Sequence, residues 1–268
     1  MKTIFAFEMK SYYKSMAIWM ASIASIIVLM MVFFPLFSDE GANFDKLMAD
    51  YPEPLLKAFG MSSTLSLTTV LGYFSFVFAL SQLALAIQAS NYGFSILSVE
   101  EREFTADFLL SKPVSRQHIL MGKFLAAALT LAATGLFTFI ISWASIELFR
   151  DGRPYDQTHV FLLLSTVFLF QLCFLSIGMA ISVLMKRIRS VLSFSLGLAF
   201  GTYMLNAVRG LVGGNIMGLI SPFYHFDAIS ILEQGTLDLS LTLLNLSISL
   251  ISIAVVAVLY PKRDISSL

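Results

Sequence analysis

SMAIWMASIASIIVLMMVFFPLFS, the stretch Ser15–Ser38, contains no charged side chain. A helix that crosses a lipid bilayer needs roughly 20 predominantly apolar residues. The stretch therefore predicts a transmembrane helix. It is too long for the apolar region of a cleavable signal peptide, and no A-x-A site follows it, so we expect it to stay in the protein.

The same lack of charge recurs along the chain, which is 57% hydrophobic and 13% charged, against about 25% charged in ordinary soluble domains. Further charge-free blocks are Ala58–Val99, Phe124–Ile146, Val160–Met185, Ser190–Val208 and Leu239–Pro261. We interpret Ala58–Val99 as one long helix, because its Ser/Thr-rich beginning suits the membrane interface. The sequence predicts an all-α integral membrane protein, a single transmembrane domain over residues 1–268, with six spans at about 15–38, 68–97, 124–147, 160–185, 190–208 and 239–260.

The distribution of lysine and arginine predicts the orientation. With six spans both termini share one side, and that side carries 12 of the 17 lysine and arginine residues but only 6 of the 17 acids. The side richer in lysine and arginine faces the cytoplasm in most membrane proteins. We therefore expect cytoplasmic termini in a multi-pass protein of the plasma membrane. A basic inner face suits an anionic lipid leaflet and is no evidence for nucleic-acid binding.

Motifs for enzyme chemistry are missing from the sequence. It has neither a G-x-x-x-x-G-K-[ST] phosphate loop nor a G-x-S-x-G elbow, and His118, His159 and His225 fall on three different connections, without metal-ligand spacing. No acidic, basic or histidine residue falls in the charge-free blocks that form the interior of the predicted spans, where proton-coupled carriers usually need one. The lone cysteine, Cys173, permits no disulfide within one chain. We expect no enzyme and no cofactor in this chain, and an energy source in another subunit.

Uncharged polar residues do fall in the predicted spans: Gln82, Gln88, Asn91, Gln171, Asn206 and Asn245. Such residues either line a translocation path or form hydrogen bonds between helices, and the sequence leaves both interpretations open. Gly197 and Gly201 form a small-x-x-x-small step that allows two helices to approach closely. They pack either within one copy of the chain or between two copies.

One charge-dense stretch lies between the second and third predicted spans: EEREFTADFLLSKPVSRQHILMGK, Glu100–Lys123. Charges at this density exclude the stretch from hydrocarbon. Its acids gather at the beginning, where they favour a helix N-terminus, its apolar residues share a face, and Pro113 ends the helix. This predicts an amphipathic cytoplasmic helix at about 100–111. Its acidic polar face favours a protein partner, since helices that lie on lipid prefer lysine and arginine, but the residues alone leave both a protein partner and the lipid surface open.

The pattern E-x-E-x-T-x-x-x-L-L-S-x-P-V-S-R, from Glu101 to Arg116, followed by Lys123, resembles the signature of ABC-2 type ABC transporter permeases. Ser221-Pro222-Phe223 before the last span is similar to an S-P-F element of that family, and Lys262-Arg263-Asp264-Ile265 to its R-R-D ending. The chain departs from the family pattern at Phe104, where glycine is usual, and at Ala106, where leucine is frequent.

The resemblance implies the permease subunit of an ATP-driven exporter. A second permease copy would pair with this one, and two copies of a separate ATP-binding subunit would bind ATP and Mg²⁺. It implies coupling contacts from Glu100, Glu101, Glu103, Phe104, Thr105 and Phe108, with Arg116 anchoring the segment. The uncharged interior favours an apolar or amphipathic cargo such as a peptide, drug or lipid. A membrane scaffold or sensor that recruits a cytosolic protein, and a stand-alone secondary transporter, are the alternatives.

Overall fold

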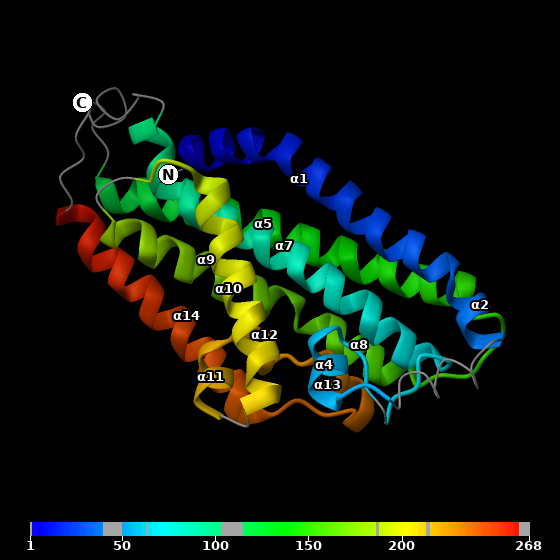
Figure 1. Ribbon diagram of the computed structural model, residues 1–268. Helices are drawn as coiled ribbons and strands as arrows, with labels where there is room; N and C mark the ends of the chain where they lie inside the picture. The colour runs from blue at the N-terminus through cyan, green and yellow to red at the C-terminus, as the bar shows by residue number, and fades with distance from the viewer. Residues whose placement is uncertain are drawn as a thin grey trace.

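The computed structural model describes residues 2–39, 50–62, 64–102, 115–185, 188–212 and 215–262, and every regular element within them is a helix (Figure 1). The long helices are α1 (Lys2–Val32), α5 (Val70–Arg102), α7 (Arg116–Phe149), α9 (Val167–Leu184), α10 (Val191–Val212) and α14 (Leu239–Leu259). The short ones are α2 (Phe34–Asp39), α4 (Glu53–Ala58), α8 (Gln157–Ser165), α11 (Asn215–Ile220), α12 (Pro222–His225), α13 (Ala228–Gln234) and the 3₁₀ turn η1 (Tyr260–Lys262).

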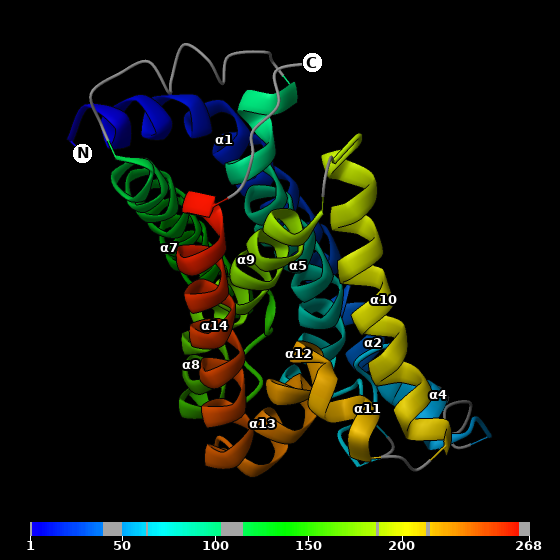
Figure 2. The same cartoon turned by 90° about the vertical axis from the view of Figure 1, so that its left-hand side faces the viewer.

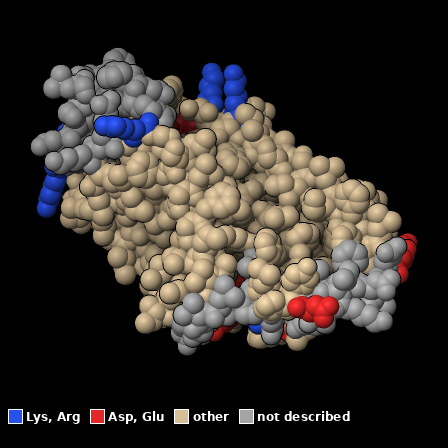
Figure 3. Space-filling model, viewed as in Figure 1, with Lys and Arg blue, Asp and Glu red and all other residues tan. Residues whose placement is uncertain are grey.

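Among the residues that the structure describes, six helical segments are long and apolar enough to cross a membrane, with α8 and α9 together forming one of them. The predicted all-α integral membrane fold is thereby confirmed. Successive spans run in opposite directions, so Lys2 and Lys262 lie at one end of the bundle, which we call the terminal end (Figure 2). The short helices α4, α11, α12 and α13 gather at the opposite, distal end. Side chains of Lys, Arg, Asp and Glu leave a broad uncharged band between the two ends on the face drawn in Figure 3.

The centre of the bundle is formed by α5 and α9. About two thirds of the most apolar window of α5 is buried (67%), against 22% for α1 and α10 and 17% for α14. On this centre, α1 packs against α7 and α5, α10 packs against α5, and α14 packs against α9. Because three helices cover only the outside of the pair, they leave long apolar faces open to the surroundings.

Two glycines set the closest approach within this centre. A Cβ atom on Gly93 of α5 would overlap the carbonyl oxygen of Leu175 and lie 3.1 Å from the Cα of Gly178 in α9. A Cβ atom on Gly178 would in turn lie 3.1 Å from the carbonyl oxygen of Ser90. Small residues permit such backbone contact between membrane helices. The sequence analysis overlooked this pair, because the two glycines lie in different spans and form no local pattern.

Two helices extend further than the apolar blocks predicted. α1 begins at Lys2 instead of residue 15, and α7 at Arg116 instead of residue 124. Four charged residues that the sequence predicted to lie in connections therefore lie on helices: Glu8, Lys10, Lys14 and Lys123. The reason is physical: a helix satisfies its own backbone groups at any depth, so it can continue past the hydrocarbon into the charged layer. Absence of charge marks the membrane-buried part of a helix and not its ends.

Candidate functional site

The residues expected to couple the chain to a partner fall mostly outside the described part. Glu103, Phe104, Thr105 and Phe108 belong to residues 103–114, which the structure does not describe, so the amphipathic helix stays a prediction. Glu100 and Glu101 lie in α5, which continues without a break to Arg102. These two acids therefore prolong the second span, and a helix over the rest of the segment stays a prediction.

At the other side of that segment, α7 begins with a well-defined cap. The Ser115 hydroxyl oxygen accepts a hydrogen bond from the His118 backbone N–H at 3.4 Å and lies 2.6 Å from the His118 Nδ1 atom. Serine at this position satisfies one of the free N–H groups of the first turn. Next to it, Arg116 Nη1 donates to the carbonyl oxygen of Pro261 at 3.3 Å. Arg116 thus joins the start of α7 to the 3₁₀ turn η1 that follows α14.

Lys123 lies two turns further along α7 and is almost completely buried, with 1% of its surface exposed. Its ammonium donates to the carbonyl oxygen of Ile96 in α5 at 3.1 Å and lies 3.6 Å from a carboxylate oxygen of Glu8 in α1. A buried lysine needs such partners, because an unpaired charge would be costly there. One side chain therefore connects three helices at the terminal end.

The Glu8 partner was missed by the sequence analysis, although the sequence held a signal for it. Glu8 is the one acid in α1, and it stands among lysines that belong to the charged layer. Its side chain is 13% exposed. A single acid on a helix that otherwise carries only basic charges favours an interaction with a buried cation elsewhere in the bundle.

Three of the predicted polar residues and a threonine form hydrogen bonds inside the bundle. Gln171 Nε2 on α9 donates to Gln88 Oε1 on α5 at 3.3 Å, and Gln88 Nε2 donates to Thr134 Oγ1 on α7 at 3.1 Å. All three side chains are fully buried. Elsewhere, Gln82 Nε2 donates to the carbonyl oxygen of Phe226 at 3.1 Å. In the described copy these groups connect helices.

Asn245 belongs to a second polar group at the distal end. Its Nδ2 atom lies 3.3 Å from His225 Nδ1, and His225 Nε2 lies 3.0 Å from the carbonyl oxygen of Leu219. A neutral imidazole that carries its hydrogen on Nε2 satisfies both contacts. Burial lowers the pKa of His225, which lies outside the spans. This pairing fixes the short helix α12 on α14.

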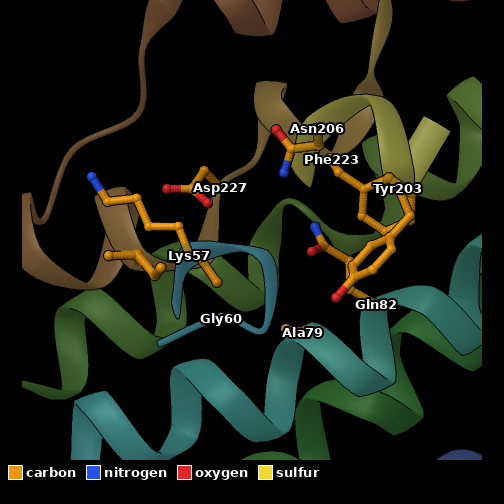
Figure 4. Close-up of a pocket in the computed structure, with 10 residues that line it drawn as sticks. Lys57, Gly60, Ala79, Gln82, Tyr203, Asn206, Phe223 and Asp227 are labelled. Carbon is orange, nitrogen blue, oxygen red and sulfur yellow. The ribbon is translucent and has the colours of Figure 1, made fainter. Parts of the chain in front are cut away.

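Of the remaining polar positions, Asn91 is partly buried on α5, and Asn206 lines a small pocket at the distal end. Gln82, Tyr203, Phe223 and Asp227 line the same pocket, where α5, α10, α12 and the start of α13 meet (Figure 4). The carboxylate of Asp227 is already occupied as the cap of α13, since it accepts from the Ser230 backbone N–H at 3.0 Å. Within the described residues, no group of three or more His, Cys, Asp or Glu side chains could hold a metal ion.

The step formed by Gly197 and Gly201 lies on an open face of α10. A Cβ atom on either glycine would meet no other atom within 4 Å. Ser193, Phe200, Met204 and Val208 are exposed on the same side, while Val191, Ser195, Ala199 and Thr202 face the bundle. Of the two interpretations of this step, packing within one copy is therefore wrong.

Comparison with known families agrees with this architecture. The family model described as ABC-2 family transporter protein matches residues 2–263. No curated protein matches the chain. Since the match extends from the first turn of α1 to the end of α14, it includes all six spans and the segment between α5 and α7. The chain is a multi-pass membrane protein that belongs to the ABC-2 family of transporter proteins, and its part in such a transporter is that of a permease component.

Proposed function

We propose that this chain is the permease subunit of an ATP-driven exporter in the plasma membrane, with the terminal end in the cytoplasm. Two copies pair and form the path, and each engages one copy of a separate subunit that binds ATP and Mg²⁺. The observation that carries the proposal is the position of Lys123. It binds α1 and α5 at the point where the acidic segment between α5 and α7 must transmit its movement.

The coupling step follows from this arrangement. A segment held by a partner at residues 100–111 pulls on the end of α5 and, through the Ser115 cap, on the start of α7. The bonds of Lys123 to Ile96 and Glu8 make those two helix ends and α1 move together. Binding of ATP by the partner would thereby tilt three of the six spans, and no nucleotide needs to bind this chain.

The second permease copy is expected at α10. Its open face carries Ser193, Gly197 and Gly201 at four-residue spacing, flanked by Phe200 and Met204. Repeated small residues allow two identical helices to approach with their backbones close together, and identical chains most often pair with two-fold symmetry. α10 stands at the edge of the bundle in Figure 2, accessible to another copy.

The cargo is expected to be apolar or amphipathic, as a peptide, drug or lipid is. Within the described residues, Gln88, Thr134 and Gln171 form hydrogen bonds across α5, α7 and α9. A path through the centre of one copy would have to break these bonds. A path between two copies would instead pass the apolar, exposed side chains of α10, such as Leu192 and Phe200.

The test is reconstitution of the chain with an ABC ATP-binding subunit from the same organism, comparing Glu101→Lys/Glu103→Lys with the native pair. Reversal of two docking acids replaces attraction by like-charge repulsion, which costs several kcal/mol at an interface. We expect loss of cargo export and of cargo-stimulated ATP hydrolysis, with normal membrane insertion. The matched control is Glu233→Lys, an exposed acid on α13 at the distal end, which should export normally.

Other outcomes separate the alternatives. A double variant that exports normally would exclude the acidic segment as the ATPase contact. A native chain that binds the ATPase but exports nothing would instead be a scaffold or sensor. Uptake driven by an ion gradient, with no ATPase present, would identify a secondary transporter.

A further inference from the structure

The first turns of α1 are attached to the bundle along one side. Glu8 pairs with Lys123, the ring centroids of Tyr12 and Tyr92 lie 4.7 Å apart, and the Tyr92 hydroxyl donates to Ser15 Oγ at 3.2 Å. These contacts fix the rotation of α1 about its axis. The opposite side of the same turns is therefore held facing away from α5 and α7.

That opposite side carries Phe7, Lys10, Tyr13 and Lys14, which we call the lysine face. Phe7 is 70% and Tyr13 67% exposed, and both lysines are exposed as well. Spacings of three and four residues bring these side chains to one side of a helix. In Figure 3, basic side chains project from the molecule above the first half of α1.

The length of α1 determines the surroundings of this face. The helix has 31 residues, about 46 Å at 1.5 Å per residue, whereas the hydrocarbon core of a bilayer is about 30 Å thick. The same side continues toward the distal end with exposed Ile18, Ser25 and Leu29, which suit acyl chains. If these residues lie in the hydrocarbon core, the lysine face lies just outside it, at the depth of the lipid headgroups.

We propose that the lysine face binds the headgroups of anionic phospholipids. Within the part of the chain that the structure describes, neither Lys10 nor Lys14 has a carboxylate partner, and the single acid of α1 is turned to the other side. Ammonium groups at this depth attract anionic headgroups. Aromatic rings such as those of Phe7 and Tyr13 are favoured at the membrane interface. The positive charge, the aromatic rings and the depth of the lysine face thus all favour anionic phospholipid headgroups as its ligand.

Binding there has a consequence for transport, which rests on the proposed function. The turns that carry the lysine face also carry Glu8, and Glu8 holds Lys123 at the start of α7. Anionic lipid on one side of these turns would favour the position in which the other side keeps this pair. The lipid composition of the inner leaflet would then regulate coupling from the side of α1.

Tryptophan fluorescence tests the binding without any partner subunit. The chain has two tryptophans, Trp19 on α1 and Trp143 near the distal end of α7. Trp19 is partly buried against the core, so the reporter is placed at the exposed Ile18. In an Ile18→Trp/Trp19→Phe/Trp143→Phe variant, the reporter lies one turn, about 6 Å along the helix axis, from Lys14. The purified protein is reconstituted in mixtures of phosphatidylcholine with brominated phosphatidylglycerol or brominated phosphatidylcholine, and quenching gives the relative binding constant of the two lipids.

We expect the Ile18→Trp reporter to show a preference for the anionic lipid of at least about fivefold, the factor for one lysine near an anionic surface. Lys10→Gln/Lys14→Gln should abolish the preference, and so should high salt, whereas 10-fold excess inorganic phosphate should not compete. The matched control Lys57→Gln removes a charge at the distal end and should leave the preference unchanged. In a Trp19→Phe variant, Trp143 should report no effect of Lys10→Gln/Lys14→Gln.

Equal quenching by the two lipids, or an unchanged preference in Lys10→Gln/Lys14→Gln, would overturn the proposal. If those substitutions changed only the association of copies, the lysine face would be a protein interface instead. Since no ATPase takes part in the quenching assay, these outcomes are independent of whether the chain exports a cargo.

Discussion

The molecule holds two pairs of glycines that differ in their surroundings. Gly93 and Gly178 close the contact between α5 and α9, where an added Cβ atom would overlap backbone. Gly197 and Gly201 lie on α10, where an added Cβ atom would meet nothing within 4 Å. The first pair was not recognisable from the sequence, and the second was.

The difference separates contacts that complete one copy from surfaces that one copy leaves open. Around Gly93 and Gly178, large buried side chains such as Tyr92, Phe94 and Phe174 fill the space beside the crossing. Around Gly197 and Gly201 the neighbours Phe200 and Met204 are exposed. A span can therefore be central or peripheral irrespective of how apolar it is, since α14 is among the most apolar spans and the least buried.

The largest effect is expected from a substitution that disrupts the contact between α5 and α9. Gly93→Leu places a side chain where the backbone of α9 already lies, so the two helices must separate. Overpacking of this kind costs about 3 kcal/mol, and here the obstacle is backbone that cannot change rotamer. We expect aggregation during detergent extraction and a lower thermal midpoint, measured by size-exclusion fluorescence. Gly197→Leu is the matched comparison: it should leave the fold of one copy intact, with a much smaller fall in thermal midpoint, and affect only the pairing of two copies. Equal behaviour of the two variants would remove the distinction.

A second experiment tests whether the hydrogen bond between Gln88 and Gln171 stabilises the contact between α5 and α9. Gln171→Leu leaves Gln88 Oε1 buried without its donor, a loss of about 1–3 kcal/mol. Replacing both glutamines by leucine should cost less than the sum of the single changes, because both partners are then removed together. The readout is a double-mutant cycle of thermal midpoints. Additive losses would contradict a direct Gln88–Gln171 bond, and loss of export without loss of stability would favour a path role.

The open face is tested by cross-linking. Single cysteines are placed along Leu196–Asn206 in a Cys173→Ala background, and oxidation should join two copies with a period of about 3.6 residues. We expect the strongest bands at Gly197, Gly201 and Met204 and none at the inward-facing Ala199 and Thr202. Bands at Ala199 or Thr202 instead would contradict the packing of α10 on α5. If no position joined two copies, α10 would be excluded as the pairing helix.

The smallest effect concerns the distal helices, where His225 is buried with a lowered pKa. An unfolded chain binds the proton near pH 6.5, so stability should be complete above that pH and fall as the pH drops below it. One unit of pKa difference corresponds to about 1.4 kcal/mol. The thermal midpoint should fall more between pH 7.5 and 5.5 in the native chain than in His225→Gln. His118→Asn, a change of an exposed histidine, should retain the native dependence.

Orientation can be tested separately, because it rests on charge statistics alone. In the Cys173→Ala background, a cysteine at Gln157 at the distal end should react in intact cells with an impermeant thiol reagent, and one at Ser11 at the terminal end should not. Both positions are exposed in the structure. The reversed result would place the termini outside and would remove the proposed contact with a cytoplasmic ATPase.

The sequence was sufficient for the six spans, because a bilayer imposes a minimum length of uncharged chain. It was insufficient for the ends of α1 and α7, since helices continue into layers where charges are permitted. It also could not pair Gly93 with Gly178, Gln88 with Gln171, or Glu8 with Lys123. Such pairs depend on the depth and rotation of helices far apart in the chain. The coupling residues Glu103, Phe104, Thr105 and Phe108 remain predictions.

The contacts of α1 also bear on the order in which the protein can be assembled during its synthesis. Ser15 accepts a hydrogen bond from the hydroxyl of Tyr92, which lies 77 residues later in the chain. The thioether of Met9 accepts one from the hydroxyl of Thr130, 121 residues later. Tyr12 packs on Tyr92, and Glu8 pairs with Lys123, which is synthesised later still. Lys123 leaves the ribosome only after the whole of α5. Insertion of α1 into the bilayer therefore precedes the fixing of its rotation. A nascent chain halted before residue 123 would hold α1 in the membrane with its acid unpaired, exposed to whatever insertion machinery surrounds it.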